Sequence, residues 1–105
     1  MINPKMLKQI EQMQANMEKA QEELGSLTVE GTAGGGVVKI VMNGHQEVKS
    51  VTISPDVVEA DDVETLQDVI MAAFEDAQQK AQEAMQQKMG AATGGMSGLG
   101  LPGLP

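Results

Sequence analysis

Apolar side chains recur at alternating intervals of four and three positions along the first 25 residues. This spacing aligns them on one stripe of an α-helix and leaves charged and amide side chains on the rest of its surface. The stripe comprises Met6, Ile10, Met13, Met17, Ala20 and Leu24. Asn3 and Pro4 are typical of a helix start, and Gly25 is typical of a helix end. The pattern predicts a long helix with one face packed against a partner.

Three short segments rich in β-branched residues follow this helix. They are typical of strands and cover residues 27–32, 37–42 and 48–53. Gly34, Gly35 and Gly36 lie between the first two and favour a loop with positive φ, while Asn43-Gly44 between the last two favours a hairpin. The short connections predict a three-stranded antiparallel sheet.

Side-chain matching predicts the register of the second hairpin. A two-residue turn would place apolar residues opposite charged ones, whereas a four-residue loop over 43–46 pairs Val38 with Val51 and Val41 with Val48. We favour the longer loop for this reason. It places Val38, Ile40, Met42, Val51 and Ile53 on one face of the sheet and Val37, Val41 and Val48 on the other. Both faces are therefore expected to be at least partly covered.

A second long helix is predicted over residues 63–89. The stretch Asp61-Asp62-Val63-Glu64 has the form of a capping box, and Gly90 is expected to end the helix. Its apolar face comprises Val63, Leu66, Ile70, Ala73, Phe74, Ala77, Ala81, Ala84 and Met85. Because this helix is longer than a small sheet, its last turns are expected to project or to meet a second subunit.

Residues 1–89 are expected to form one domain, and residues 90–105 a flexible Gly/Leu/Pro tail. The tail holds six glycines, two prolines and no charged residue, so it buries too little apolar surface to offset the entropy of ordering. Within the domain, Phe74 is the sole aromatic residue. The core of one chain is therefore thin, and self-association would supply the missing burial.

The formal net charge of −8 is unevenly spread: residues 1–53 sum to −1 and residues 54–105 to −7. An anionic partner should prefer the first half. The chain has no cysteine, which excludes disulfides and thiolate metal sites. No stretch approaches the roughly 20 apolar residues of a membrane span, so a cytoplasmic protein without membrane contact is expected.

Three candidate sites are better explained by local structure. The glycine cluster lies between two strands, whereas a phosphate cradle must open a helix. The acids Asp56, Glu59, Asp61, Asp62 and Glu64 lack the spacing of a calcium loop and suit helix capping. His45 beside the hairpin is expected to be exposed and inert, and no nucleophile accompanies it. Neither an enzyme nor a cofactor is predicted.

Five features in fixed order resemble the YbaB/EbfC family of bacterial nucleoid-associated proteins. They are a polar helix ending in Gln-Glu-Glu-Leu, a glycine loop, the run Gly-Val-Val-Lys-Ile-Val-Met-Asn-Gly over 36–44, the Val-Thr-Ile-Ser-Pro corner over 51–55, and a Leu-x-x-x-Ile-x-x-Ala-Phe-x-x-Ala helix. The resemblance implies an α+β fold, with an α-β-β-β-α protomer in an intertwined homodimer. It further implies binding of double-stranded DNA with limited sequence preference, and a place in the nucleoid.

Any DNA contact must come from local lysines because the chain is acidic and lacks arginine. The DNA-binding candidates are Lys5, Lys8, Lys19, Lys39, Lys49, Lys80 and Lys88. Similar proteins often carry basic pairs where this chain has Lys49-Ser50 and Gln79-Lys80, so half of each pair is missing. We expect weak binding that depends steeply on salt and reads few bases.

A homodimeric adaptor is the alternative hypothesis. Residues 55–76 hold eight acids and no lysine, which suits a basic protein partner better than phosphates. The methionine seam of Met6, Met13 and Met17 offers a second adaptable surface, although such spacing is more typical of simple helix packing.

Overall fold

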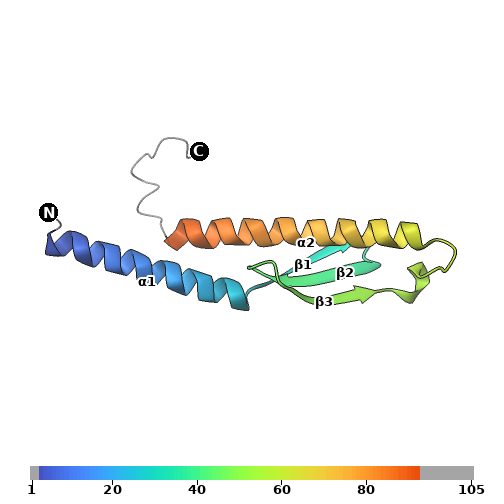
Figure 1. Ribbon diagram of the computed structural model, residues 1–105, viewed down its shortest axis with the longest axis horizontal. Coiled ribbons are helices and arrows are strands. Elements are labelled where there is room, and N and C mark those ends of the chain that lie inside the picture. Colours follow the sequence, from blue (N-terminus) through green and yellow to red (C-terminus); the bar gives the residue numbers. More distant parts are fainter. Residues whose placement is uncertain (1–2, 93–105) are drawn as a thin grey trace, which may run out of the picture.

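The computed structural model describes residues 3–92 and has the predicted α-β-β-β-α order (Figure 1). Three antiparallel strands form one sheet in the order β1-β2-β3, which confirms the α+β fold class. The elements are α1 (Pro4–Ser26), β1 (Thr28–Ala33), β2 (Val38–Asn43), β3 (Val48–Ile53), the short 3-10 helix η1 (Pro55–Val57) and α2 (Val63–Ala92). The chain segment over 93–105, which holds most of the expected flexible tail, lies outside the described residues.

The start of α1 follows the capping rule. The side-chain oxygen of Asn3 accepts a hydrogen bond from the backbone N–H of Met6 at 2.8 Å, and Pro4 occupies the first turn. The predicted stop at Gly25 is wrong by one residue, because the helix includes Gly25 and ends at Ser26. The turn between β2 and β3 contacts this end of the helix, where the Gly44 N–H donates to the Leu24 carbonyl. This turn therefore supplies a cap in place of Gly25.

The strands begin close to their predicted positions, with β1 and β2 each displaced by one residue along the chain. In β1 and β2, Gly31 pairs with Ile40 and Ala33 with Val38. The loop between these strands contains three consecutive glycines with φ of 66°, 76° and 93°. Glycine tolerates this left-handed conformation without steric cost, as the sequence predicted.

The predicted register of the second hairpin is wrong. Val38 pairs with Ile53, not with Val51, and the register shifts at Val41 and Met42 so that Lys49 becomes an extra, bulged residue. A slip of two residues leaves Val51 on its predicted face, since side chains alternate with a period of two. The bulge moves Val48 to that same face, opposite to the prediction.

The turn itself explains the different register. The N–H of Asn43 donates to the Glu47 carbonyl at 3.0 Å, and the N–H of Gln46 donates to the Asn43 carbonyl at 3.0 Å. Gln46 has a φ of 65°. This is a three-residue loop built on a tight turn followed by one left-handed residue, a geometry that is commonly associated with a bulge.

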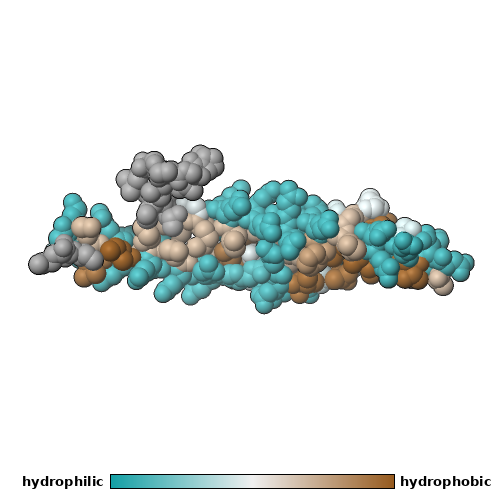
Figure 2. Space-filling view, turned by 45° about the horizontal axis from the view of Figure 1, so that its top comes forward, coloured by the Kyte–Doolittle hydropathy of each residue, from teal (hydrophilic) through white to brown (hydrophobic). Residues whose placement is uncertain are grey.

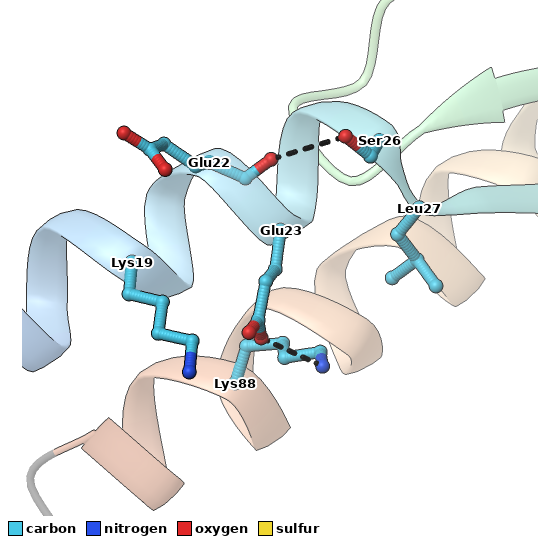
Figure 3. A pocket seen from close by; sticks show the side chains of 6 residues that line it. All are labelled: Lys19, Glu22, Glu23, Ser26, Leu27 and Lys88. Carbon is cyan, nitrogen blue, oxygen red and sulfur yellow. Dashed lines mark hydrogen bonds and ion pairs between the residues drawn. The ribbon is translucent and has the colours of Figure 1, made fainter.

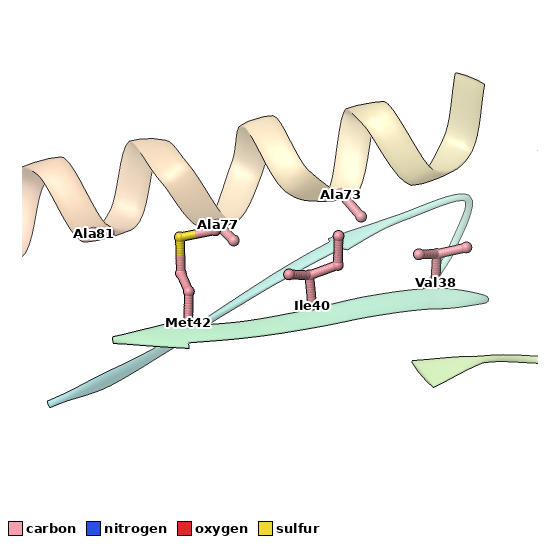
Figure 4. Close-up of a cluster of buried hydrophobic side chains, with 6 residues drawn as sticks. All are labelled: Val38, Ile40, Met42, Ala73, Ala77 and Ala81. Atoms are coloured by element: carbon pink, nitrogen blue, oxygen red, sulfur yellow. The ribbon is translucent and has the colours of Figure 1, made fainter. Parts of the chain in front are cut away.

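The core lies between α2 and the face of the sheet made by β1 and β2. Val38, Ile40 and Met42 of β2 point toward α2, where Ala73, Ala77 and Ala81 meet them (Figure 4). All six are buried. Gly31 of β1 faces the same helix, and a Cβ atom added there would lie 2.6 Å from Ala77 Cβ and closer still to α2 backbone atoms. Small residues on both sides therefore allow a very close approach of helix and strand.

The core of one chain is thin, as the composition predicted. Within residues 3–92, four of the eight buried hydrophobic residues are alanines, and Phe74 remains 36% exposed. The molecule measures 69 × 27 × 18 Å with a radius of gyration of 19.6 Å. A compact domain of this length would have a radius of gyration of about 13 Å. The long helices, and not a central globule, set its shape.

The second helix begins at Val63, with its cap one residue later than the capping box predicted from Asp61 to Glu64, and it runs further than predicted. Asp62 Oδ1 accepts hydrogen bonds from the Thr65 N–H at 3.3 Å and the Thr65 hydroxyl at 2.8 Å, so this acid acts as a helix cap. The predicted end at Gly90 is wrong by two residues, because α2 continues through Gly90 to Ala92. At 30 residues α2 is about 45 Å long, and its last turns extend beyond the sheet to lie beside α1 (Figure 1).

Candidate nucleic-acid interface

Charge divides the molecule into two unlike ends. Residues 54–76 hold eight acids and no lysine, while the rest of the chain holds the other seven acids and all seven lysines. The acidic segment comprises η1, the connection to α2 and the first half of α2, far from the N-terminus of α1 (Figure 1). The whole net charge of −8 thus resides in this segment. A polyanion meets strong repulsion there and a balanced charge distribution at the other end.

Two lysines line a cleft between α1 and α2. Lys19 of α1 and Lys88 of α2 extend into it from facing helices (Figure 3). The cleft has a volume of about 460 Å³ and is lined by Lys19, Glu22, Glu23, Ser26, Leu27 and Lys88. Lys88 Nζ lies 3.0 Å from Glu23 Oε2. Among residues 3–92, Lys19 forms no ion pair.

Helix packing holds this cleft together. Ala20 and Leu24 of α1 are buried, and the Gln21 side-chain amide donates to the sulfur of Met89 at 3.6 Å. Figure 1 shows the first turns of α1 extending past the C-terminal end of α2. Met6 is 49% and Ile10 41% exposed there. The predicted apolar stripe is therefore buried at its C-terminal end and open at its N-terminal end.

The turn between β2 and β3 caps the C-terminus of α1. The N–H of Gly44 donates to the Leu24 carbonyl at 2.8 Å, and His45 Nε2 lies 2.9 Å from the Gln21 carbonyl. Because a carbonyl only accepts, the imidazole donates from Nε2. The Leu24 carbonyl is among the last four of α1, which a helix end leaves without an intrahelical partner, whereas the Gln21 carbonyl lies in the preceding turn. A Cβ atom at Gly44 would lie 2.6 Å from Leu24 Cδ2, so glycine is needed for close approach.

His45 is exposed, as predicted, but the prediction that it is inert missed this contact with α1. The Asn-Gly-His sequence indicated only a hairpin. Nothing in its pattern could indicate that the hairpin would lie against a helix end.

Asn43 organises the same turn from a buried position, with 1% of its surface exposed. Its Oδ1 accepts from the N–H groups of His45 at 2.9 Å and Glu47 at 3.0 Å, and its Nδ2 donates to Glu47 Oε1 at 2.7 Å. The hydrogen bond from Asn43, followed by the charge of Lys49, lowers the pKa of the Glu47 carboxyl. Asn43 thus shapes the turn that contacts the C-terminal end of α1.

Two further lysines meet at Glu30 on β1. Lys39 Nζ lies 3.6 Å from Glu30 Oε1, and Lys80 Nζ donates to the Glu30 carbonyl at 2.9 Å. Lys80 also pairs with Asp76 at 3.2 Å. Both lysines therefore share the β1 side of the sheet, although they are 41 positions apart in the sequence.

The remaining candidates are separate from these clusters. Lys5 and Lys8 are exposed on the first turns of α1, and Lys49 is exposed at the bulge of the edge strand β3. None of the three forms an ion pair within the described part of the chain. The structure thus divides the predicted lysines into one cleft pair, one sheet-side pair and three single side chains.

Asp76 joins α2 to the edge of the sheet. Its Oδ2 accepts a hydrogen bond from the backbone N–H of Thr32 at 3.0 Å. This bond, together with the one from Lys80, lowers the pKa of the Asp76 carboxyl from its ordinary value. The carboxylate thereby pairs an N–H of an edge strand that has no neighbouring strand on that side.

An apolar groove runs between α2 and β3. It has a volume of about 320 Å³ and is lined by Ile40, Val48, Val51, Ile70, Met71, Phe74 and Glu75. Met71 is 60% and Val51 49% exposed. Figure 2 shows hydrophobic side chains gathered over the half of the molecule that contains the sheet, with a smaller group near the start of α1. The β3 bulge helps to form this groove because it brings Val48 to the side of Val51.

Metal-ligating side chains do not cluster within residues 3–92: nowhere do three or more of them gather closely enough to hold an ion. Across the same residues, no helix combines the length and apolarity needed to cross a membrane.

Comparison with known proteins gives consistent matches along almost the whole chain. The model of the YbaB/EbfC DNA-binding family matches residues 2–96. A nucleoid-associated protein of Chloroflexus aurantiacus is 52% identical over 99 residues, which is 93% of this chain and 99% of that protein. A nucleoid-associated protein of Roseiflexus sp. (strain RS-1) is 53% identical over 103 residues, or 97% and 99% of the two chains.

A solved structure shares the fold. The crystal structure of an uncharacterized protein from Helicobacter pylori aligns with a TM-score of 0.70 at 20% identity, covering 83% of this chain and 92% of that one. At this identity the likeness concerns the architecture alone.

Proposed function

Because the chain belongs to the YbaB/EbfC DNA-binding family, we propose that it binds double-stranded DNA as a homodimer with little sequence preference. It acts in the cytoplasm at the nucleoid, where it affects nucleoid organisation or gene expression. The binding needs no cofactor, and the protein is not an enzyme.

The presence of Lys19 and Lys88 in the lining of one cleft carries this proposal. Their ammonium groups lie on facing helices, at the end of the molecule away from the eight acids of residues 54–76. A lysine is a point charge that suits phosphate oxygens but carries no base-specific hydrogen-bonding pattern. The chain has no arginine for bidentate contacts to guanine and only one aromatic residue for stacking. These residues favour contacts to the DNA backbone over base readout.

A second copy of the chain is the proposed occupant of the groove between α2 and β3. The groove borders β3, an edge strand whose outer backbone groups have no partner strand among the described residues. Edge strands of this kind pair readily with another chain, and a two-fold axis would join the same patch on both copies. The thin core of one chain gains apolar burial in this arrangement. A dimer also presents two lysine clefts to one duplex.

The DNA proposal is tested by fluorescence anisotropy with a mixed-sequence duplex at several salt concentrations. We expect weak binding whose log affinity falls with log salt by about 0.9 for each phosphate contact. Lys19→Gln/Lys88→Gln should lower both the affinity and this slope. Lys39→Gln/Lys49→Gln removes the same charge from the sheet and serves as the matched control. Equal losses in the two double variants would show that the cleft is not the site, and no complex at low salt would refute DNA binding.

The dimer proposal is tested by sedimentation equilibrium. Val51→Glu places a charge in the groove and should shift the wild-type dimer toward monomer. Val58→Glu is the matched control because Val58 is 58% exposed and does not line the groove. A compact monomer for the wild-type chain at micromolar concentration would refute the dimer, and an unchanged mass for Val51→Glu would exclude this groove.

A dimeric adaptor for a basic protein is the second candidate. It is favoured by the eight acids and the absence of lysine over residues 55–76. A pull-down from nuclease-treated lysate distinguishes the two functions, because only a protein partner survives removal of nucleic acid. Retention should then be lost in Glu59→Gln/Asp61→Asn/Glu64→Gln. This variant spares the Asp62 cap of α2.

A further inference from the structure

We infer that Glu23 competes with DNA phosphate for Lys88, so that the chain's own carboxylate limits how tightly the cleft between α1 and α2 holds DNA. The inference rests on the proposed DNA binding and concerns its regulation at the same site. Removal of the Glu23 charge should therefore strengthen DNA binding.

The carboxylate of Glu23 lies between the ammonium groups of Lys19 and Lys88 in the cleft (Figure 3). Glu23 Oε2 lies 3.0 Å from Lys88 Nζ, and the two side chains remain 42% and 40% exposed. Figure 3 shows the Glu23 carboxylate directed at Lys88, whereas the carboxylate of Glu22, which also lines the cleft, points away from α2. A phosphate entering the cleft from solvent thus finds Lys19 available and Lys88 already engaged by a carboxylate.

The ion pair is exchangeable because it is exposed to solvent. Pairs of this kind contribute little net stability, so a phosphate oxygen can replace the carboxylate oxygen as the acceptor for Lys88. The displaced Glu23 carboxylate then stays beside the phosphate and repels it. Glu23 opposes binding in both steps: it must first be displaced, and it then adds like charge to the occupied site.

The expected size of the effect follows from these two terms. Releasing Lys88 from one exposed ion pair corresponds to a gain in affinity of about threefold. A symmetric dimer that uses both clefts should gain about tenfold. The log–log salt slope should steepen by about 0.9 for every lysine that newly engages a phosphate.

A purely structural role for the same ion pair predicts the opposite sign. Glu23 and Lys88 join α1 to α2, and loss of either partner would loosen the cleft if that bridge were needed to hold it. Glu23→Gln and Lys88→Gln would then both weaken DNA binding. Competition instead predicts that Glu23→Gln strengthens binding while Lys88→Gln weakens it.

The test measures anisotropy with the full-length chain and a mixed-sequence duplex for the wild type, Glu23→Gln, Glu22→Gln and Lys88→Gln. Glu22→Gln is the matched control, since it makes the same charge change one position away. Circular dichroism melting of each variant checks that the fold is retained. The double variant Glu23→Gln/Lys88→Gln completes a double-mutant cycle. Removing the Glu23 charge should increase DNA affinity less in the Lys88→Gln background than in the wild type, because the lysine that it would release is absent.

The outcomes separate the two claims. Tighter binding and a steeper salt slope for Glu23→Gln than for Glu22→Gln support competition. Equal affinities of these two variants, or weaker binding by Glu23→Gln, overturn it while leaving the DNA proposal intact if the wild type binds. Failure of every variant to bind at low salt refutes the DNA proposal itself, and the competition falls with it.

Discussion

Replacing Gly31 by alanine tests the central packing contact of the fold. Gly31 lies on β1 where α2 approaches most closely, and its neighbours across the interface are Ala73 and Ala77. The backbone of Gly31 does not have a positive φ, so the substitution introduces no dihedral strain. Its effect comes from the added methyl group alone.

The magnitude follows from the geometry. The new Cβ atom would lie 2.6 Å from Ala77 Cβ, whereas ordinary contacts begin at 3.4 Å. The helix and strand must therefore separate by at least about 0.8 Å. Backbone atoms of α2 are closer still to the new methyl group and cannot rotate away. Overpacking of this kind costs about 3 kcal/mol, at the upper end of the usual range, because the gap also weakens the contacts of the buried alanines with β2.

Thermal unfolding followed by circular dichroism measures the effect. We expect Tm to fall by roughly 12 °C or more for a loss of about 3 kcal/mol in a chain of this size. Gly25→Ala is the control, because its Cβ would lie 3.6 Å from His45 in ordinary contact and alanine is the better helix former. A Tm for Gly31→Ala equal to that of the wild type would refute the close approach of α2 to β1.

Three other predictions concern single residues. Asn43→Ala should lower the free energy of unfolding, measured in urea, by about 2 kcal/mol, because it removes buried hydrogen bonds within the β2–β3 turn. A loss near zero would contradict the role of Asn43 in stabilising this turn. Asp76→Asn should be less stable than the wild type at pH 7, because the lowered pKa of Asp76 stabilises the fold while the carboxylate is charged. The difference should shrink as the pH falls below the ordinary aspartate pKa and be lost once the pH is below the lowered pKa of the folded state; a pH-independent difference in Tm would argue against it. Gly90→Ala should stabilise the end of α2 by up to about 1 kcal/mol, because alanine is a better helix former than glycine and nothing lies within 4 Å of the new methyl group. A lower helix content by circular dichroism would contradict the extension of α2 to Ala92.

For the seven candidate lysines, the sequence predicted which residues are candidates but not how they are grouped in space. Their identity follows from composition, since no other cations are present apart from one histidine. Their grouping does not, because Lys19 and Lys88 are 69 positions apart in the sequence and share a cleft only through the packing of two helices. Sequence spacing likewise could not predict the ion pairs of Lys39 and Lys88. The pair between Asp76 and Lys80 could be predicted, because these residues are one helical turn apart.

Local patterns by themselves determined the elements of this protein. Helical periodicity, β-branched runs, glycine loops and capping residues act over a few neighbouring positions, so they predicted two helices and three strands to within a few residues. They also predicted the thin core, because composition limits how much apolar volume is available for burial.

Only the tertiary structure decided how these elements meet. The register of β2 and β3 depends on a left-handed Gln46 and a bulge at Lys49, which side-chain matching did not predict. The roles of Gly31 and Gly44 arise from close approach to residues distant in the sequence, and His45 contacts α1 for the same reason. Such contacts depend on the shape of two packed surfaces at once, and no short stretch of sequence contains both.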